Sequence, residues 1–234
     1  MTDPRVAAGF ARLIETRRSA LDSGTGSLGW KAAFGAPSSR QLLDLHAPAV
    51  GYLTEATRIV SGAAVDITDW VAPLIEFELA LTLGRVVDPG EPPDDARKAI
   101  SAVGPAIELA DVDLPVDQAH LEDIVAGNIF HRHVVFGRTD PDGAGCDLEG
   151  LQFTATVGDT VHNVTDFEEM TGDYGEVVVT VAQYLAGHGL ELGPGDVVIG
   201  GSVVPPIRVA GPVVAHYRLG DAPSITVELV SGPS

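Results

Sequence analysis

The stretch 72-APLIEFELALTLG-84 decides how the chain folds, and it places two glutamates, Glu76 and Glu78, inside an otherwise apolar segment. In a strand, alternate residues share a face, so the large apolar side chains from Ile75 to Leu83 point one way and the two glutamates point the other. The two carboxylates then lie about 7 Å apart along the strand and repel each other, more strongly if they are buried. Taken alone, the pattern favours an antiparallel strand whose glutamate face contacts solvent.

A second segment, 103-VGPAIELAD-111, has the same alternation. Glu108 shares its face with Ala106 and Ala110, whereas Ile107 and Leu109 point to the other face. A glutamate flanked by alanines fits a confined site better than an open surface. Three carboxylates on two strands would form an oxygen-rich cluster of the kind that Mg²⁺ or Mn²⁺ prefers, and the ion would remove the repulsion. Spacing leaves both interpretations open, because Glu-x-Glu is a common pattern.

The composition limits the classes of function. The 234 residues include 14 basic and 33 acidic side chains, which gives a formal net charge of −19. Such a chain repels phosphate backbones, so no nucleic-acid partner is expected. The single cysteine, Cys146, excludes a disulfide within the chain. The sequence has neither a signal-peptide pattern nor an apolar run of about 18 residues, so we expect a soluble cytoplasmic protein with no membrane partner.

Periodicity and turn residues predict a β-rich core with peripheral helices, that is, one α+β domain. Helices are expected over residues 2–24, 38–47, 92–104, 117–128 and 174–189. Asp3 is the expected cap of the first helix, Ser38 or Ser39 of the second, and Asp117 of the fourth. Strands are expected over most of 27–36, 50–84, 103–111, 129–138 and 151–164, and in short pieces after Leu190.

Six short segments add a family resemblance. They are 29-GWKAAFG-35, 50-VGYL-53, 75-IEFELALTLG-84, 104-GPAIELAD-111, 123-DIVAGN-128 and 192-LGPGDVVIGGS-202. Each motif is weak by itself, but their order is much more specific. Together they resemble the 2-keto-4-pentenoate hydratase and 4-oxalocrotonate decarboxylase family of the fumarylacetoacetate hydrolase superfamily, over residues 29–230.

The resemblance implies a mixed β-sheet roll of the fumarylacetoacetate hydrolase C-terminal-domain type, with peripheral helices. Residues 1–234 would form a single catalytic domain, with an N-terminal helical segment over 1–28 and the β-roll core over 29–234. The resemblance also implies Mg²⁺ or Mn²⁺ as cofactor, a small-molecule 2-oxo acid as substrate and assembly into a homo-oligomer.

Matching the motifs assigns roles to individual residues. The resemblance makes Glu76, Glu78 and Glu108 the metal ligands and Lys31 a catalytic residue or the group that binds a substrate carboxylate. The substrate-binding candidates are Asn128, Ser202, Leu53 and Phe34.

The implied chemistry begins when a metal polarises the carbonyl of a 2-oxo acid and stabilises the enolate that forms. We expect a hydratase-like carbon–oxygen lyase that adds water to a 2-hydroxydienoic acid, as in the catabolism of aromatic compounds. The alternatives are a 2-oxo-acid decarboxylase, an acylpyruvate-type C–C hydrolase and a non-catalytic partner subunit. The hydrolase would need a His–Glu pair to activate water, and His46 is the only histidine in the relevant region.

The chain departs from the family pattern where protons would be transferred. Ala49 stands where an acidic residue is expected, and Gly127 replaces an aspartate. Nearby groups that could substitute are His46, Glu122, Asp123, His131 and His133, and of these we expect Asp123 to act as a catalytic residue. The segment 131-HRH-133 could place two imidazoles on one face, as in a cupin-like metal site, but a solvent-facing strand is the favoured interpretation.

Overall fold

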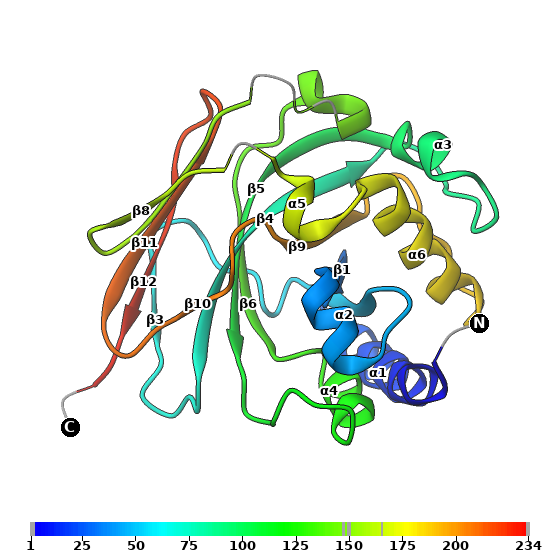
Figure 1. Ribbon diagram of the computed structural model, residues 1–234, viewed down its shortest axis with the longest axis horizontal. Coiled ribbons are helices and arrows are strands. Elements are labelled where there is room, and N and C mark those ends of the chain that lie inside the picture. The colour runs from blue at the N-terminus through cyan, green and yellow to red at the C-terminus, as the bar shows by residue number, and fades with distance from the viewer. Residues whose placement is uncertain (1–2, 147, 149–150, 165, 233–234) are drawn as a thin grey trace.

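Strands β4 (Pro73–Leu83) and β5 (Ile100–Asp111) lie at the centre of the larger of two β-sheets. They pair antiparallel along their whole length, with Ile75 opposite Leu109 and Phe77 opposite Ile107. The computed structural model describes residues 3–146, 148, 151–164 and 166–232. In Figure 1 the smaller sheet lies on one side of β4 and β5, and the helices lie on the other.

The larger sheet has seven strands in the order β2-β1-β9-β4-β5-β6, with β10 paired to one end of β4. β1 and β9 run parallel, and the other pairs are antiparallel. The bounds of the remaining strands are β1 Ser27–Ala33, β2 Ala49–Thr54, β6 His131–Phe136, β9 Val197–Ser202 and β10 Ile207–Arg208. This mixed sheet confirms the predicted α+β class.

The smaller sheet has five strands in the order β3-β12-β11-β7-β8. Along β11, Ala215 and Tyr217 are buried while His216 and Arg218 are exposed, so one face packs inward. The Tyr217 ring lies 5.5 Å from that of Phe77, between centroids. The Phe77 face of β4 therefore packs on the smaller sheet, and the glutamate face points the other way. The bounds are β3 Ala63–Asp66, β7 Phe153–Val157, β8 Thr160–His162, β11 Val213–Leu219 and β12 Ile225–Val230.

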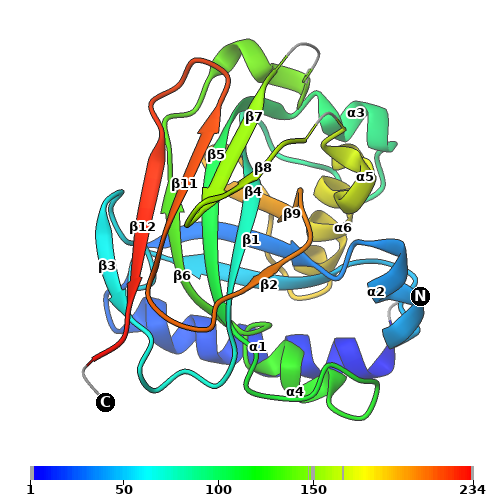
Figure 2. The ribbon, with the colours of Figure 1, turned by 60° about the vertical axis from the view of Figure 1, so that its left-hand side comes forward.

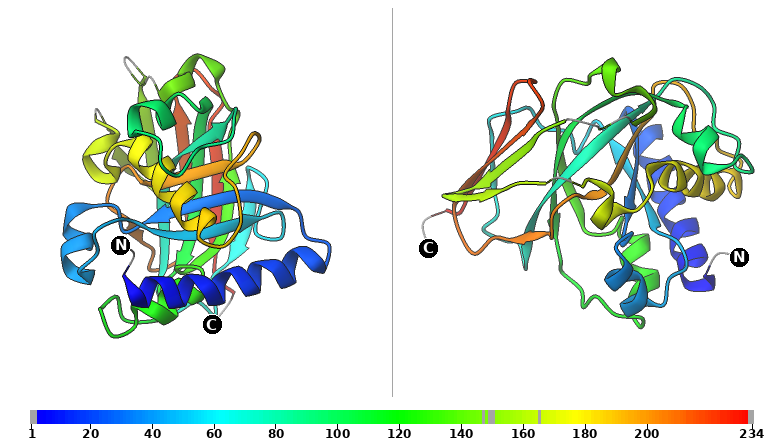
Figure 3. Two further views of the ribbon diagram at one scale, coloured as in Figure 1. Left: turned by 90° about the vertical axis from the view of Figure 1, so that its right-hand side faces the viewer. Right: turned by 45° about the horizontal axis from the view of Figure 1, so that its top comes forward.

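Six α-helices and one 3₁₀ segment, Pro141–Cys146, surround the sheets in the described part of the chain. Figures 2 and 3 show α1 and α4 side by side beneath the larger sheet. Gly9 allows this contact, because a Cβ there would lie 2.5 Å from the carbonyl oxygen of Glu122. Among these helices, none has the length and apolar character needed to cross a bilayer. Their bounds are α1 Pro4–Asp22, α2 Pro37–Leu43, α3 Pro93–Arg97, α4 Leu121–Ala126, α5 Glu168–Thr171 and α6 Tyr174–Ala186.

Two of the helices match the sequence predictions closely. The predicted cap of α1 is confirmed, since the Asp3 carboxylate accepts a hydrogen bond from the Arg5 backbone N–H at 2.8 Å. The valine-rich segment for which a helix was expected over residues 174–189 is α6, whose first turn is capped by Asp173 through the backbone N–H of Glu176 at 2.9 Å.

Other helix predictions were wrong in detail. α2 begins at Pro37 with Ala36 as its N-cap, so neither Ser38 nor Ser39 caps it. α3 ends at Arg97, because the residues from Ile100 onward pair with β4. α4 starts later than predicted, and Asp117 instead accepts hydrogen bonds from two backbone N–H groups in the preceding turn.

Gly29 lets β1 approach β9, and its replacement tests this pairing. The φ angle of Gly29 is 144°, and a Cβ there would lie 1.9 Å from the carbonyl oxygen of Val197. We expect Gly29→Ala to lower the free energy of unfolding by at least about 2 kcal/mol, because the two strands must separate. Gly211→Ala is the matched control, since a Cβ there meets nothing within 4 Å, and it should change the value by less than about 0.5 kcal/mol. Urea unfolding measures both, and equal midpoints would contradict the role of Gly29.

Candidate metal centre

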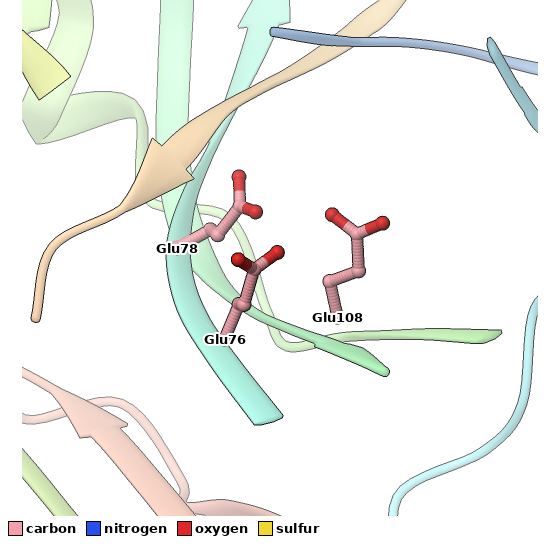
Figure 4. A group of neighbouring side chains, drawn as sticks. All are labelled: Glu76, Glu78 and Glu108. Carbon is pink, nitrogen blue, oxygen red and sulfur yellow. The ribbon is translucent and has the colours of Figure 1, made fainter. Parts of the chain in front are cut away.

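Three glutamate carboxylates converge between β4 and β5. Glu76 lies directly opposite Glu108 in the antiparallel ladder, and Glu78 shares their face because it is two residues along β4. Each residue offers a carboxylate oxygen, and these oxygens all lie within 4.8 Å of one another. Figure 4 shows the side chains of Glu76 and Glu78 meeting that of Glu108 from the neighbouring strand. The cluster expected from the alternation of two separate segments is thus present.

The glutamate face is covered, so the solvent-facing interpretation of this strand is wrong. Glu78 and Glu108 are 1% and 0% exposed, and Glu76 is half-buried. Beyond the glutamates the same face carries a small apolar cluster, made of Leu53, Ala80, Ala106, Val134 and Ile199. Alternation alone missed this covering, because it separates two faces without saying what packs on each.

Two of the three carboxylates are held by different partners. Glu78 accepts a hydrogen bond from the Gly201 backbone N–H at 2.7 Å. One oxygen of Glu108, Oε1, accepts from Lys31 Nζ and lies 2.8 Å from His131 Nδ1. The other oxygen, Oε2, is buried and has no hydrogen-bond partner within the described residues. Leaving a buried carboxylate oxygen without a partner is costly, so this atom points to a cation that the three glutamates could hold.

The charges of the cluster are unbalanced without such an ion. Burial raises the pKa of Glu76 to about 7, and the charge of Glu108 adds to the effect. The same causes keep the pKa of Glu78 well above its usual range. Burial also disfavours the ionised form of Glu108, but Lys31 and His131 outweigh it and lower its pKa to about 2. A divalent cation would favour ionisation of all three carboxylates.

Lys31 is buried on β1 and lies against Glu108. Its Nζ also donates to the carbonyl oxygen of Ile129 at 3.3 Å. Burial lowers the pKa of Lys31, but the charges of the three glutamates outweigh it and the pKa is raised overall, so the side chain stays an ammonium. Gly51 on β2 provides the space, because a Cβ there would lie 2.8 Å from Lys31 Cγ and 2.7 Å from Asn128 Oδ1.

A left-handed turn closes one side of the centre. Asn128, Ile129 and Phe130 have φ angles of 62°, 50° and 64°, a conformation that non-glycine residues adopt rarely. The Asn128 side-chain amide accepts from the Tyr52 backbone N–H at 2.8 Å and donates to the Tyr52 carbonyl at 3.0 Å. Both polar groups of the amide therefore bind the edge of β2, where they hold the turn that presents the Ile129 carbonyl to Lys31.

A cavity of about 530 Å³ opens beside the glutamates. Its wall is mainly apolar, with Phe34, Phe130 and Met170 among the larger side chains. Within the described part of the wall, Lys31 is the only lysine or arginine, and no histidine is present. Ser202 also lines the cavity, but its Oγ accepts a hydrogen bond from the Phe77 backbone N–H at 3.2 Å. The cavity can thus surround an apolar ligand that carries one anionic group.

A comparison with protein families identifies the fold. The profile described as fumarylacetoacetate (FAA) hydrolase C-terminal matches residues 30–227. The chain belongs to this fumarylacetoacetate hydrolase family. The match spans every element that contributes to the centre, from Lys31 on β1 to Ser202 on β9.

The relatives of this fumarylacetoacetate hydrolase family member include hydratases and a decarboxylase. The chain is 26% identical over 191 residues to the 2-hydroxyhexa-2,4-dienoate hydratase of Comamonas testosteroni, covering 80% of this chain and 72% of that protein. It is also 26% identical over 230 residues to the TodF product hydratase of Pseudomonas putida F1, covering 94% and 82%. A 4-oxalocrotonate decarboxylase of a Pseudomonas species is 27% identical over 133 residues, covering 57% and 51%.

Solved structures share the fold of the family member. The 4-oxalocrotonate decarboxylase from Pseudomonas putida G7, complexed with magnesium and adipate, superposes with a TM-score of 0.82 at 20% identity, covering 95% of this chain and 85% of that one. The fumarylpyruvate hydrolase from Pseudomonas aeruginosa, in complex with Mn²⁺ and pyruvate, superposes with a TM-score of 0.66 at 13% identity, covering 87% and 89%.

The structure does not bring every candidate residue to the centre. Asp123 is exposed on α4, where its carboxylate lies 2.8 Å from Arg12 of α1, so its position gives no support to the predicted catalytic role. Leu53 is buried in the small apolar cluster and does not line the cavity. Phe34 and Ser202 do line it, whereas the Asn128 amide is occupied by Tyr52. Ala49 is buried in the main core, and His46 is exposed.

The two histidines of 131-HRH-133 lie on different faces, so the cupin-like and the fully solvent-facing interpretations are both wrong. A β-bulge sets His131 opposite Ala110 and His133 opposite Leu109, which leaves Arg132 as the extra residue. His131 is buried beside Glu108, whereas His133 stacks on Trp70 with ring centroids 6.2 Å apart. Alternation cannot detect a bulge, because the bulge itself interrupts the alternation.

The raised pKa of Glu76 predicts how stability depends on pH when no metal is bound. A carboxyl whose pKa is higher in the folded protein than in the unfolded chain favours folding at low pH, and this contribution is lost as the pH rises through about 7. We expect the unfolding temperature of chelator-treated protein to fall between about pH 4.5 and 7, less steeply in Glu76→Gln. Added Mg²⁺ should raise the unfolding temperature most above about pH 7, where the ligand carboxylates are ionised. Thermal unfolding followed by circular dichroism measures this, and parallel curves for both proteins would contradict it.

Proposed function

We propose that the protein is a divalent-metal-dependent, hydratase-like lyase that adds water to a short 2-hydroxy-2,4-dienoic acid, the enol form of a 2-oxo acid. The observation that carries the proposal is the set of three converging carboxylates, one with a buried unpartnered oxygen, beside a buried lysine in an apolar cavity. The names of two relatives, both hydratases, support the reaction class.

Glu76, Glu78 and Glu108 would hold the metal, which we propose to be Mg²⁺ or Mn²⁺. Structures of the same fold in complex with magnesium or Mn²⁺ support this choice. When bound, the ion would supply Lewis acidity at the 2-oxo oxygen of the substrate and favour the enolate form.

Lys31 binds the substrate carboxylate in this proposal. An ammonium has three N–H donors, and Glu108 and Ile129 occupy two of them, so one remains for a ligand in the cavity. Because the raised pKa keeps Lys31 protonated, the side chain acts as a positive charge and a hydrogen-bond donor rather than as a base.

The reaction balances as the addition of one water molecule. The enol hydroxyl loses its proton as C2 becomes a carbonyl, and C5 gains a proton. The carbon–carbon double bond that remains then lies between C3 and C4. The water oxygen then forms a bond to C4 and a proton is added at C3, giving a 4-hydroxy-2-oxo acid. The apolar wall surrounds the hydrocarbon end of the substrate while Lys31 fixes its carboxylate, so the chain's residues hold the reacting carbons in one orientation.

Two alternatives fit the cavity less well. A C–C hydrolase needs a base to activate water, but the described wall holds no histidine and His46 is exposed elsewhere. A decarboxylase acting on an oxalocrotonate-type diacid would bring a second carboxylate into a cavity whose described wall has one cation. We also propose that the protein acts in the cytoplasm and, from the sequence resemblance, that it assembles as a homo-oligomer.

The turnover of metal-loaded protein tests the function. Wild type should hydrate 2-hydroxypenta-2,4-dienoate in the presence of Mg²⁺ or Mn²⁺, seen as loss of the dienol absorbance, and chelator should stop it. Glu76→Gln should lower kcat/KM by at least about 100-fold, because the variant loses a charged ligand. Glu228→Gln, at an exposed position on β12, is the matched control and should be fully active. Metal binding without turnover of a dienoate, an oxalocrotonate-type diacid or an acylpyruvate would favour the non-catalytic partner subunit.

The charge of the cavity wall predicts the substrate preference. Wild type should prefer a monocarboxylate with an apolar end, such as 2-hydroxyhexa-2,4-dienoate, over the corresponding diacid by about 100-fold or more in kcat/KM, because the second carboxylate would lose water without a partner. Met170→Lys adds a cation to the wall and should narrow this ratio, whereas Met170→Leu should keep it. An unchanged ratio in Met170→Lys, or a wild type that prefers the diacid, would contradict the prediction.

A further inference from the structure

The two oxygens of Glu108 have unequal surroundings. Oε1 accepts from Lys31 and lies 2.8 Å from His131 Nδ1, whereas Oε2 has no partner within the described residues. A carboxylate can rotate so that either oxygen takes either environment. Because the two oxygens are chemically equivalent, what the structure must fix is the orientation of the carboxylate, so that one oxygen is directed away from Lys31 and His131 and left for a cation.

Lys31 alone is a poor guide for this orientation. Its ammonium is a point charge on a flexible stem, with donors that can rotate toward different acceptors. It also lines the cavity, where an anionic ligand competes for the same charge. His131 does not line the cavity, and its side chain is 1% exposed, so a ligand in the cavity leaves its contact with Glu108 undisturbed.

The imidazole of His131 is held from both sides. Because a carboxylate only accepts hydrogen bonds, Nδ1 carries the proton that it donates to Glu108. The other nitrogen, Nε2, lies 2.9 Å from Thr57 Oγ1, and a hydroxyl can donate or accept. Thr57 is itself fixed to β6, since its carbonyl oxygen accepts from the Val134 backbone N–H at 3.0 Å.

The β-bulge at Arg132 makes this placement possible. Without the extra residue His131 would continue the alternation of His133 and Val135, whose face packs away from the glutamates. The extra residue turns His131 toward Glu108, and the Arg132 guanidinium lies 3.1 Å from Asp113 at the surface. The bulge therefore puts an imidazole behind a metal ligand on a strand where regular pairing would not.

We propose that His131 is a positioning residue that holds Oε1 of Glu108 so that Oε2 faces the metal. The inference rests on the proposed metal-dependent function. In this proposal His131 is not a metal ligand. It acts through the hydrogen bond that its Nδ1–H donates to Glu108, and Thr57 fixes the plane of the imidazole ring.

Direct titration of the purified protein with Mn²⁺, measured by calorimetry, tests the role of His131 without any substrate. His131→Leu should weaken the affinity by about 10- to 100-fold, as is typical when a group that orients a metal ligand is lost. His131→Asn places an amide N–H near the position of Nδ1 and should stay within about 3-fold of wild type. His131→Gln places its amide near Nε2, where it reaches Thr57 but not Glu108, and should resemble His131→Leu.

His133→Leu is the matched control, because it removes an imidazole from the same strand on the face away from Glu108, and its affinity should equal that of wild type. Unfolding temperatures in chelator should be similar for His131→Asn and His131→Gln, so that a difference in affinity is not a difference in folding. Wild-type affinity in His131→Leu, or equal weakening in all three His131 variants, would overturn the inference. Absence of Mn²⁺ binding by wild type would instead overturn the proposed function.

Discussion

The repulsion among three carboxylates is the constraint on which the rest of the centre depends. Their ligand oxygens lie within 4.8 Å of one another on a face that is largely covered, and one lysine is the nearest compensating charge. Lys31 and His131 lower the pKa of Glu108 and favour its ionised form, while burial and the neighbouring carboxylates raise the pKa values of Glu76 and Glu78. The protein has stabilised one member of the cluster as an anion and left the other two dependent on a cation, which favours metal binding over an empty site.

Neighbouring elements serve this charge arrangement. Gly51 leaves space for the Lys31 stem, and the left-handed turn at Asn128–Phe130 turns a backbone carbonyl toward its ammonium. The Asn128 amide anchors that turn to β2 by imitating the hydrogen bonds of a neighbouring strand. Residues that carry no charge thus fix where the buried Lys31 ammonium lies, and its charge helps to lower the pKa of Glu108.

The sequence allowed the ligand cluster and the long helices to be predicted, because both depend on regular periods. Period-two alternation put Glu76 and Glu78 on one face, and β5 repeated the pattern at Glu108. The same reasoning failed at His131, since a one-residue bulge reverses the faces of everything beyond it. Nearness to Gly127 in the chain suggested Asp123 as a substitute acid, but nearness in sequence does not reveal that its exposed carboxylate pairs with Arg12 on α1.

Ala49 marks where the chain parts from the family pattern, and its surroundings explain how the centre can do without an acid there. Ala49 pairs with Ala33 across β1 and β2 and is buried in the main core, outside the cavity wall. An ionised side chain at that position would lose its hydration among apolar neighbours. We therefore expect proton transfer in the proposed hydration to use the hydroxyl groups of the wall or water itself. Since the reaction consumes water, the same solvent that enters as the reactant can carry the protons that a side chain at position 49 no longer supplies.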